Sequence, residues 1–243
     1  MARIEAKVSD GRVLDLIRGW LTADILRGLE TWTPTRGSPQ GAIISPLLAN
    51  IYFDPLDAWL AGRGYRMVRY ADDFVILCRT REAAQAALAD VRAWVSENGL
   101  ALHPEKTHVG DRRQPGEGFE FLGYRFEAGK RYVRKKSLDK LKDSIRAKTR
   151  RTRGDSLARI VADLNRTLRG WFEYFKHAHH NTFKGLDAFT RRRLRALLRR
   201  QEKRTSRMGK SLADHKRWPI AFFAKNGLFA LHTAHLSARQ SRC

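Results

Sequence analysis

In the first sixty residues, apolar side chains recur at helical spacing on either side of a segment rich in glycine and proline. Asp10 is a suitable N-cap for the first of these stretches. The apolar residues of that stretch are Val13, Leu14, Leu16, Ile17 and Leu21. A second helix is predicted from about Ser45 to Leu60, with Ser45 as its N-cap and Pro46 in its first turn, where a missing N–H leaves no bond unmade. The pattern therefore predicts two helices that pack through one face.

The next segment has the pattern of two short strands joined by a turn. Apolar residues at 67–68 and 74–77 flank the sequence Tyr70-Ala71-Asp72-Asp73, which places two adjacent carboxylates at the bend. Residues 81–98 then show a helical period and end at Asn98-Gly99, a common helix stop. The apolar face of this helix consists of Ala84, Leu88, Val91 and Val95.

Beyond residue 118 the pattern changes from alternation to long basic helices. Phe119, Phe121 and Gly123 alternate with Glu120, Leu122 and Tyr124, which predicts another hairpin. From Ser137 onward apolar residues recur at helical spacing among many arginines and lysines. We therefore predict an α+β fold with two domains: residues 1–130, an antiparallel sheet with packing helices, and residues 131–243, an all-α basic domain with a carboxyl-terminal tail.

The distribution of charge follows the same division. The formal net charge is +23 and the pI is near 10.9, which points to a polyanionic partner. Residues 1–129 hold 16 basic and 17 acidic side chains, leaving 32 of the 48 basic and 8 of the 25 acidic ones for residues 130–243. No stretch of about 18 apolar residues and no signal pattern occurs, so we expect a protein of the cytoplasm with no membrane partner. The two cysteines, Cys78 and Cys243, suit neither a disulfide framework nor a zinc cluster.

The adjacent carboxylates Asp72 and Asp73 are the clearest candidates for chemistry. Aspartate oxygens are ligands that magnesium prefers, and nucleotidyl transfer uses two such ions about 3.5–4 Å apart. An Asp-Asp pair at a turn is by itself more often a solvated bend than a metal site. The interpretation therefore depends on what accompanies the pair.

Three further motifs accompany it in a fixed order. They are Arg36-Gly37-Ser38-Pro39-Gln40-Gly41 upstream, and His103-Pro104-Glu105-Lys106-Thr107 and Phe119-Glu120-Phe121-Leu122-Gly123-Tyr124 downstream. Together with the carboxylate turn they resemble the palm of reverse transcriptases, and within these the group II intron reverse transcriptase/maturase proteins. The resemblance is highly specific at 36–53 and 67–78 and weaker beyond 130. It implies that residues 1–130 are a partial polymerase palm.

This resemblance assigns a role to each motif. It implies that Asp72 and Asp73 bind two magnesium ions and that Tyr70 packs beside the primer end. It also implies that Lys106 neutralises the triphosphate and that Leu122-Gly123 grips the primer. The incoming deoxynucleotide and the template would lie against Gly37, Pro39, Gln40 and Gly41, where glycine lets a strand approach the backbone closely.

The basic half resembles the thumb, or maturase, domain of the same family. Its aromatic residues are more often packing than base-stacking residues, whereas the interleaved arginines would face outward to phosphates. The arginines expected to bind RNA are Arg166, Arg169, Arg191, Arg192, Arg193 and Arg195. The resemblance implies three partners: intron RNA, whose splicing the protein would assist, an RNA template with a DNA primer, and deoxynucleoside triphosphates. His177, His179 and His180 are read as solvated or phosphate-facing residues, because no cysteine pair accompanies them.

One departure from the family pattern leaves two functions open. The family has a third metal-binding aspartate on a strand upstream of the Gly-Ser-Pro-Gln-Gly motif, and Asp10, Asp15 and Asp24 do not follow an apolar strand. We therefore expect an amino-terminally truncated chain that also lacks the fingers. The alternative to an active polymerase is a non-catalytic RNA-binding remnant. A separate amino-terminal fragment or self-association would complete the site.

Overall fold

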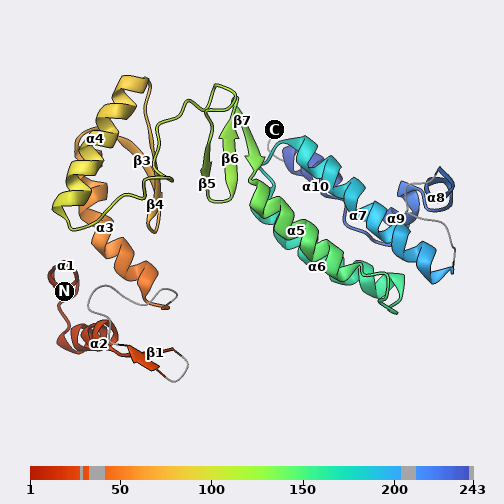
Figure 1. Cartoon of the computed structure of the whole chain (residues 1–243), viewed down its shortest axis with the longest axis horizontal. Coiled ribbons are helices and arrows are strands. Elements are labelled where there is room, and N and C mark those ends of the chain that lie inside the picture. Colours follow the sequence, from red (N-terminus) through yellow and green to blue (C-terminus); the bar gives the residue numbers. More distant parts are fainter. Residues whose placement is uncertain (28–29, 33–41, 204–211, 241–243) are drawn as a thin grey trace. The chain divides into compact units, whose positions relative to one another are not determined.

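The computed structural model describes residues 1–27, 30–32, 42–203 and 212–240. The chain forms two compact units, the first unit (Met1–Val109) and the second unit (Gly110–Cys243) (Figure 1). The boundary between the units falls between Val109 and Gly110 in the sequence. The predicted hairpin that begins at Phe119 therefore belongs to the same compact unit as the basic helices. The domain division at residue 130 remains a prediction.

The first unit combines helices with two small antiparallel sheets. Asp10 caps the second helix as predicted, since its Oδ1 accepts hydrogen bonds from the Arg12 N–H at 2.8 Å and the Val13 N–H at 3.2 Å. Thr80 caps α4 in the same way through the Ala83 N–H. The elements are α1 (Ala2–Glu5), α2 (Gly11–Thr22), β1 (Ile25–Arg27), β2 (Glu30–Trp32), α3 (Ser45–Gly62), β3 (Arg66–Tyr70), β4 (Asp73–Leu77) and α4 (Arg81–Glu97).

Two details of these predicted helices differ in the structure. The N-cap of α3 is Ile44 and Ser45 is the first helical residue, so the predicted N-cap lay one position too late. In α2 Ile17 is buried and Leu14 and Leu21 are partly buried, whereas Val13 and Leu16 are exposed, so part of the predicted apolar face is not covered within the described part of the chain.

The core of the first unit lies between the β3–β4 hairpin and two helices. One face of the hairpin, made of Met67, Phe74 and Ile76, packs against buried residues of α3 and α4. Those buried residues are Leu56, Leu60, Val91, Trp94 and Val95. The hairpin is therefore held on one side only, and its other face carries exposed side chains such as Val68 and Tyr70.

The second unit begins with a three-stranded antiparallel sheet and continues as a helical body (Figure 1). In Figure 1, α5, α6, α7 and α10 run alongside one another. Its elements are β5 (Phe119–Phe121), β6 (Tyr124–Glu127), β7 (Lys130–Val133), α5 (Lys135–Lys148), α6 (Leu157–Phe175), α7 (His180–Gln201), α8 (Leu212–Arg217), α9 (Ile220–Lys225) and α10 (Leu231–Gln240). Together with the first unit, these elements give a mixture of helices and small antiparallel sheets, which is compatible with the predicted α+β class.

The core of the second unit is larger, with 16 buried side chains in one described cluster. On α6 the buried residues Leu164, Leu168 and Phe172 follow the helical period, as predicted for its apolar face. A buried carboxylate, Asp187 of α7, accepts hydrogen bonds from the N–H groups of Leu231 and His232, both at 3.0 Å. Asp187 thereby satisfies N–H groups of the first turn of α10, which have no partner within that helix. In the described ranges, no helix has both the length and the apolar character needed to cross a membrane.

Candidate functional site

The two candidate metal-binding carboxylates lie at the tip of the β3–β4 hairpin. Tyr70 pairs with Asp73 across the antiparallel ladder, so Ala71 and Asp72 form the two-residue connection. Ala71 has a φ of +54°, the left-handed conformation that a turn this tight requires. Asp72 and Asp73 are both exposed, and Tyr70, which begins the turn, is 67% exposed. Adjacent oxygen ligands are therefore available to a cation approaching from solvent.

Arg69, which was not predicted as a site residue, holds the turn by a hydrogen bond to its backbone. The Arg69 side chain is only 11% exposed, and its guanidinium binds the Asp57 carboxylate of α3, with Nε donating to Oδ1 at 2.8 Å. The Nη1 group donates to the Asn50 side chain and to the carbonyl oxygen of Ala71, both at 2.9 Å. Because the Asp57 carboxylate accepts hydrogen bonds from Nε and Nη2 of Arg69, the pKa of Arg69 is raised. Arg69 thus ties the backbone beside Asp72 to helix α3.

The described residues supply only part of a metal site. They contain no group of three or more histidine, cysteine or acidic side chains placed to hold one ion. Asp10 caps α2, and Asp15 pairs with Arg18 at 2.8 Å, so both acids have partners of their own within the first unit. Asp72 and Asp73 fit a hard divalent cation by the chemistry and exposure of their oxygens, and further oxygen ligands would be needed to complete the coordination.

The predicted nucleotide-binding residues fall in two places. Gly37, Pro39, Gln40 and Gly41 lie outside the described residues. Lys106 lies in a turn of the first unit, where its N–H donates to the His103 carbonyl oxygen at 3.2 Å, and it is exposed.

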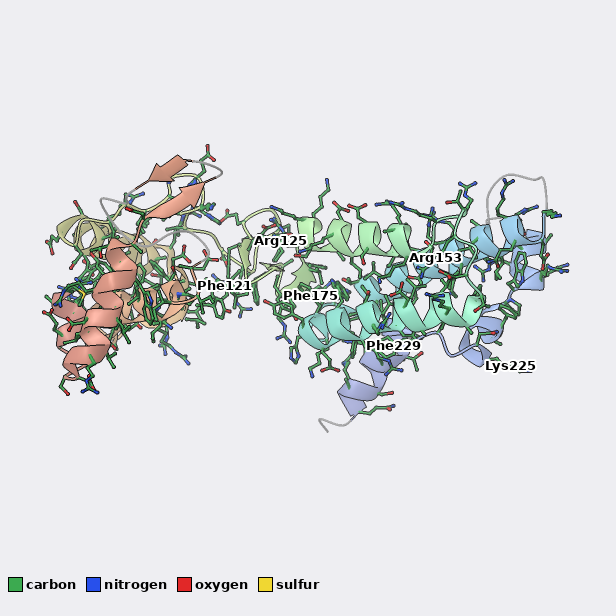
Figure 2. The ribbon with its side chains drawn as sticks, turned by 90° about the horizontal axis from the view of Figure 1, so that it is seen from below. Phe121, Arg125, Arg153, Phe175, Lys225 and Phe229 are labelled. Atoms are coloured by element: carbon green, nitrogen blue, oxygen red, sulfur yellow. The ribbon has the colours of Figure 1, made fainter. Side chains whose placement is uncertain are left out.

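The predicted primer-gripping turn lies between β5 and β6 and is held by the end of α6. Leu122 and Gly123 have φ values of +48° and +78°. The Tyr174 hydroxyl donates to the Leu122 carbonyl oxygen at 2.9 Å, and the Tyr124 hydroxyl donates to the Tyr174 carbonyl oxygen at 2.6 Å. A Cβ atom on Gly123 would lie 3.3 Å from Cζ of Phe175, so glycine permits the close approach. Figure 2 labels Phe175 and Arg125 in this part of the second unit.

The six arginines expected to bind RNA divide into outward and inward groups. Arg166 is exposed and bonded to Asp163, whereas Arg169 lies over the Phe229 ring at 4.7 Å. Arg191 is partly exposed and Arg192 is exposed.

Arg193 and Arg195 use their guanidinium groups within the fold. Arg193 donates to the hydroxyl and the carbonyl oxygen of Thr149 at 3.0 and 2.9 Å. Arg195 is 3% exposed, and its Nε donates to the Trp218 carbonyl oxygen at 2.9 Å. Burial lowers the pKa of both arginines. Helical spacing had suggested an outward direction for these two side chains, but further helices pack against that side of α7.

A partly buried acid, Asp163, lies where α5 and α6 are connected. Asp163 accepts hydrogen bonds from Lys148 at 2.7 Å, Arg153 at 3.1 Å and Arg166 at 3.2 Å (Figure 2 labels Arg153). These donors, Lys148 first, hold the pKa of Asp163 far below its usual range. Some of the positive charges of the second unit are therefore paired with an acidic side chain of the same unit.

The histidines at the start of α7 contact aromatic and backbone groups. The His179 ring lies 4.3 Å from that of His180 and 5.6 Å from that of Tyr132. Burial lowers the pKa of His179, which favours the neutral ring. His235 of α10 places Nδ1 3.0 Å from the Lys176 carbonyl oxygen.

Comparison with known proteins identifies both halves of the chain. Residues 5–126 match the model of the family "Reverse transcriptase (RNA-dependent DNA polymerase)". Residues 138–218 match "Group II intron, maturase-specific domain".

Three relatives illustrate the range of similar proteins. The chain is 27% identical over 163 residues to protein YkfC of Escherichia coli K12, covering 51% of this chain and 41% of that protein. It is 40% identical over 57 residues to the group II intron-encoded protein LtrA of Lactococcus lactis, covering 24% and 10%. It is 39% identical over 84 residues to the retrovirus-related Pol polyprotein from the retrotransposable element R2 of Nasonia vitripennis, covering 31% and 8%.

The chain spans less than half the length of each of these relatives. The reverse transcriptase model nevertheless matches half of the chain and includes the carboxylate turn, and the maturase model matches the region that contains the basic helices α6 and α7. The chain therefore belongs to the reverse transcriptase family, the RNA-directed DNA polymerases, and carries a group II intron maturase-specific domain.

Proposed function

We propose that this protein acts as a group II intron-type reverse transcriptase/maturase, which copies RNA into DNA by two-metal nucleotidyl transfer and binds intron RNA to assist splicing. The observation that carries the proposal is the exposed Asp72-Asp73 turn, braced by Arg69, within the segment that matches the reverse transcriptase family. The palm interpretation of the first unit and the place of action, the bacterial cytoplasm, belong to this proposal.

Asp72 and Asp73 would hold Mg²⁺, which when bound stabilises the charge that develops at the transferred phosphorus. The two carboxylates bring negative charge to one exposed turn, and Arg69 keeps that turn in place against α3. Tyr70, largely exposed beside them, would pack against the primer end. Further oxygen ligands would come from a separate amino-terminal fragment or from a second copy of the chain.

The other predicted residues would position the substrates. Lys106 would place a point charge near the triphosphate of the incoming deoxynucleotide, and Gly37, Pro39, Gln40 and Gly41 would support that nucleotide and the template. The Leu122-Gly123 turn would hold the DNA primer on the RNA template. Tyr174 would keep this turn in position, because its hydroxyl binds the Leu122 carbonyl oxygen.

Intron RNA would bind the outward basic residues of the second unit. Arg166, Arg169, Arg191 and Arg192 are the arginines we assign to this role, because their side chains reach the surface or its edge. The buried Arg195 is left out because it already donates to the Trp218 carbonyl oxygen. Phosphate contacts of this kind make binding strongly dependent on salt.

A second candidate function, RNA binding without catalysis, is favoured by one observation. The described residues provide no third metal-binding group beside Asp72 and Asp73, whereas the basic second unit has a substantial core of its own.

The test that separates the two functions is primer extension on an RNA template with a DNA primer, Mg²⁺ and deoxynucleotides. The wild-type chain is compared with Asp72→Asn/Asp73→Asn and with a control, Asp15→Asn/Asp54→Asn, which removes two other exposed carboxylates of the first unit. Extension by wild type and control, but not by Asp72→Asn/Asp73→Asn, supports the polymerase. Equal RNA binding by all three without extension supports the non-catalytic function.

A further inference from the structure

The second unit has a groove whose lining shares no residue with the candidate polymerase site. Its volume is about 610 Å³, and its lining comes from helices α5, α7, α8 and α9. Binding sites for small organic groups commonly have volumes of about 300–1,000 Å³. The groove is therefore large enough to receive a nucleotide.

Apolar side chains contribute part of the lining. Leu138 of α5 and Phe189 of α7 are partly buried at the edge of the core of the second unit, and Leu186 is buried within it. Ile220, the first residue of α9, is 62% exposed. The exposed Ile220 and the partly buried ring of Phe189 therefore give the groove an apolar surface, against which a flat, weakly polar group can pack.

The ionisable side chains of the lining are all of the basic type. Lys142, Arg191, Arg192, Arg195 and His215 line the groove, and no acidic side chain does so among the described residues. Lys142 lies 3.6 Å from Asp139, which is outside the lining. In the described ranges neither Arg191 nor Arg192 forms an ion pair, so both guanidinium groups remain available to an anion.

Phe189 connects the apolar and the basic parts. Its ring centroid lies 5.3 Å from the guanidinium carbon of Arg192 and 5.4 Å from that of Arg146. An aromatic ring flanked by cations is a platform on which a nucleobase stacks while its phosphates meet the charges.

We propose that this groove binds unpaired nucleotides of RNA, with a base against Phe189 and Ile220 and phosphates on Lys142, Arg191 and Arg192. The inference rests on the proposed RNA binding of the second unit and adds which form of RNA is recognised there. Duplex RNA presents phosphates and groove edges, but its base faces are stacked inside the helix. Only a single-stranded or looped segment can use the aromatic and the basic parts of the groove together.

The binding test uses the full chain and two fluorescein-labelled probes, an oligo(U) 8-mer and an RNA duplex of the same length, in an anisotropy titration at about 0.1 M salt. The variant Arg191→Gln/Arg192→Gln removes two charges from the groove. The control Lys225→Gln/Arg239→Gln removes two charges from exposed positions outside its lining. We expect the groove variant to bind oligo(U) at least about tenfold more weakly and the control to change less than about threefold. The slope of log K against log salt should fall by about 1.4 in the groove variant only, because two phosphate contacts on a single strand are lost.

The stacking part is tested by Phe189→Leu, which keeps an apolar side chain but removes the ring. We expect about a fivefold or larger loss of oligo(U) affinity, since a stacked base contributes about 1–3 kcal/mol, and no change for the duplex. Ile220→Ala at the exposed position provides a second variant that leaves the core intact, with an expected loss of about twofold to fivefold for oligo(U) alone. Circular dichroism and thermal melting verify that each variant is folded.

Two results overturn the groove and leave RNA binding standing. One is an equal loss in the groove variant and the control, and the other is an unchanged oligo(U) affinity in Phe189→Leu and Ile220→Ala. If the wild-type chain binds neither probe, the proposed RNA binding of the second unit fails as well.

Discussion

The two units differ in net charge and in the size of their cores. Residues 1–109 hold 13 basic and 13 acidic side chains, leaving 35 of the 48 basic and 12 of the 25 acidic ones for residues 110–243. The neutral first unit has a described core cluster of five buried residues, whereas the basic second unit has one of 16. The candidate metal-binding carboxylates therefore lie on the less extensively packed unit, and the positive charge that we propose for RNA binding lies on the unit with the larger core.

The difference has a physical reason. A unit with a net charge of +23 repels itself, and a large buried apolar surface opposes this repulsion. Acids such as Asp163 also neutralise several cations within the second unit. The first unit needs no such compensation, and its hairpin keeps one face and its acidic tip open to solvent.

The largest expected effect tests whether the two cores are separate. Leu164→Ala in the second unit and Leu60→Ala in the first each remove a fully buried side chain, and each should lower the stability of its own unit by about 2–5 kcal/mol. Hydrogen exchange resolved by peptide should show loss of protection in the mutated unit alone. A loss spread over both units in either variant would break the comparison.

The next effect concerns the brace under the carboxylate turn. Arg69→Met leaves Asp57 and Asn50 without the guanidinium and should destabilise the first unit by about 1–3 kcal/mol. It should also reduce primer extension about tenfold or more, with RNA affinity unchanged. Arg66→Met, on the exposed face of the same strand, is the matched control. A similar drop in extension for both variants would show that Arg69 has no specific effect on the turn.

A smaller effect is expected where helix α6 meets the Leu122-Gly123 turn, which we predict to grip the primer. Tyr174→Phe removes the hydrogen bond to the Leu122 carbonyl oxygen and should cost about 0.5–1.5 kcal/mol of stability in the second unit. The KM for primer–template should rise more than kcat falls. Tyr132→Phe serves as control, because the hydroxyl of Tyr132 has no hydrogen-bond partner among the described residues. An unchanged KM in Tyr174→Phe would remove Tyr174 from the positioning of the turn.

The smallest effect is a dependence of the second unit on pH. Because the pKa of Asp163 is lower in the fold than its ordinary value of 3.8, its stabilising contribution is present above that value and is lost as the pH falls toward the folded pKa. Between pH 5 and pH 3, Asp163→Asn should therefore lose a few degrees less in melting temperature than wild type. Asp139→Asn, an exposed acid on α5, should follow the wild-type curve. If Asp163→Asn also followed that curve, the ion-pair cluster would not contribute to acid sensitivity.

Local patterns predicted the carboxylate turn and the helix that follows it. The apolar runs at 67–68 and 74–77 and the helical period at 81–98 depend on neighbours within a few residues, and the hairpin and α4 occur where these signals lie. Arg69 could not be recognised in this way, since its partners Asn50 and Asp57 lie on the preceding helix, 19 and 12 residues away. Its one sequence signal was an arginine on the otherwise apolar face of a strand.

The errors on the helices have a related cause. The spacing of residues along the sequence shows which side chains share a face of a helix, but it does not show which other elements pack against that face. Arg195 was expected to point outward, yet it binds the Trp218 carbonyl oxygen, 23 residues away. Conversely, Val13 and Leu16 belong to an apolar pattern at helical spacing and yet are exposed among the described residues. Coverage is set by contacts between distant segments, which no local pattern contains.

The hydrogen bonds from α10 to Asp187 have a consequence for synthesis on the ribosome. Asp187 is translated 44 residues before Leu231, so at about 5–20 residues per second its carboxylate waits about 2–9 s for the N–H groups it will accept. During that interval the Asp187 carboxylate, which is buried in the folded second unit, lacks the two N–H donors of α10. The first unit, translated entirely before this interval, has time to form its hairpin while the second is still incomplete.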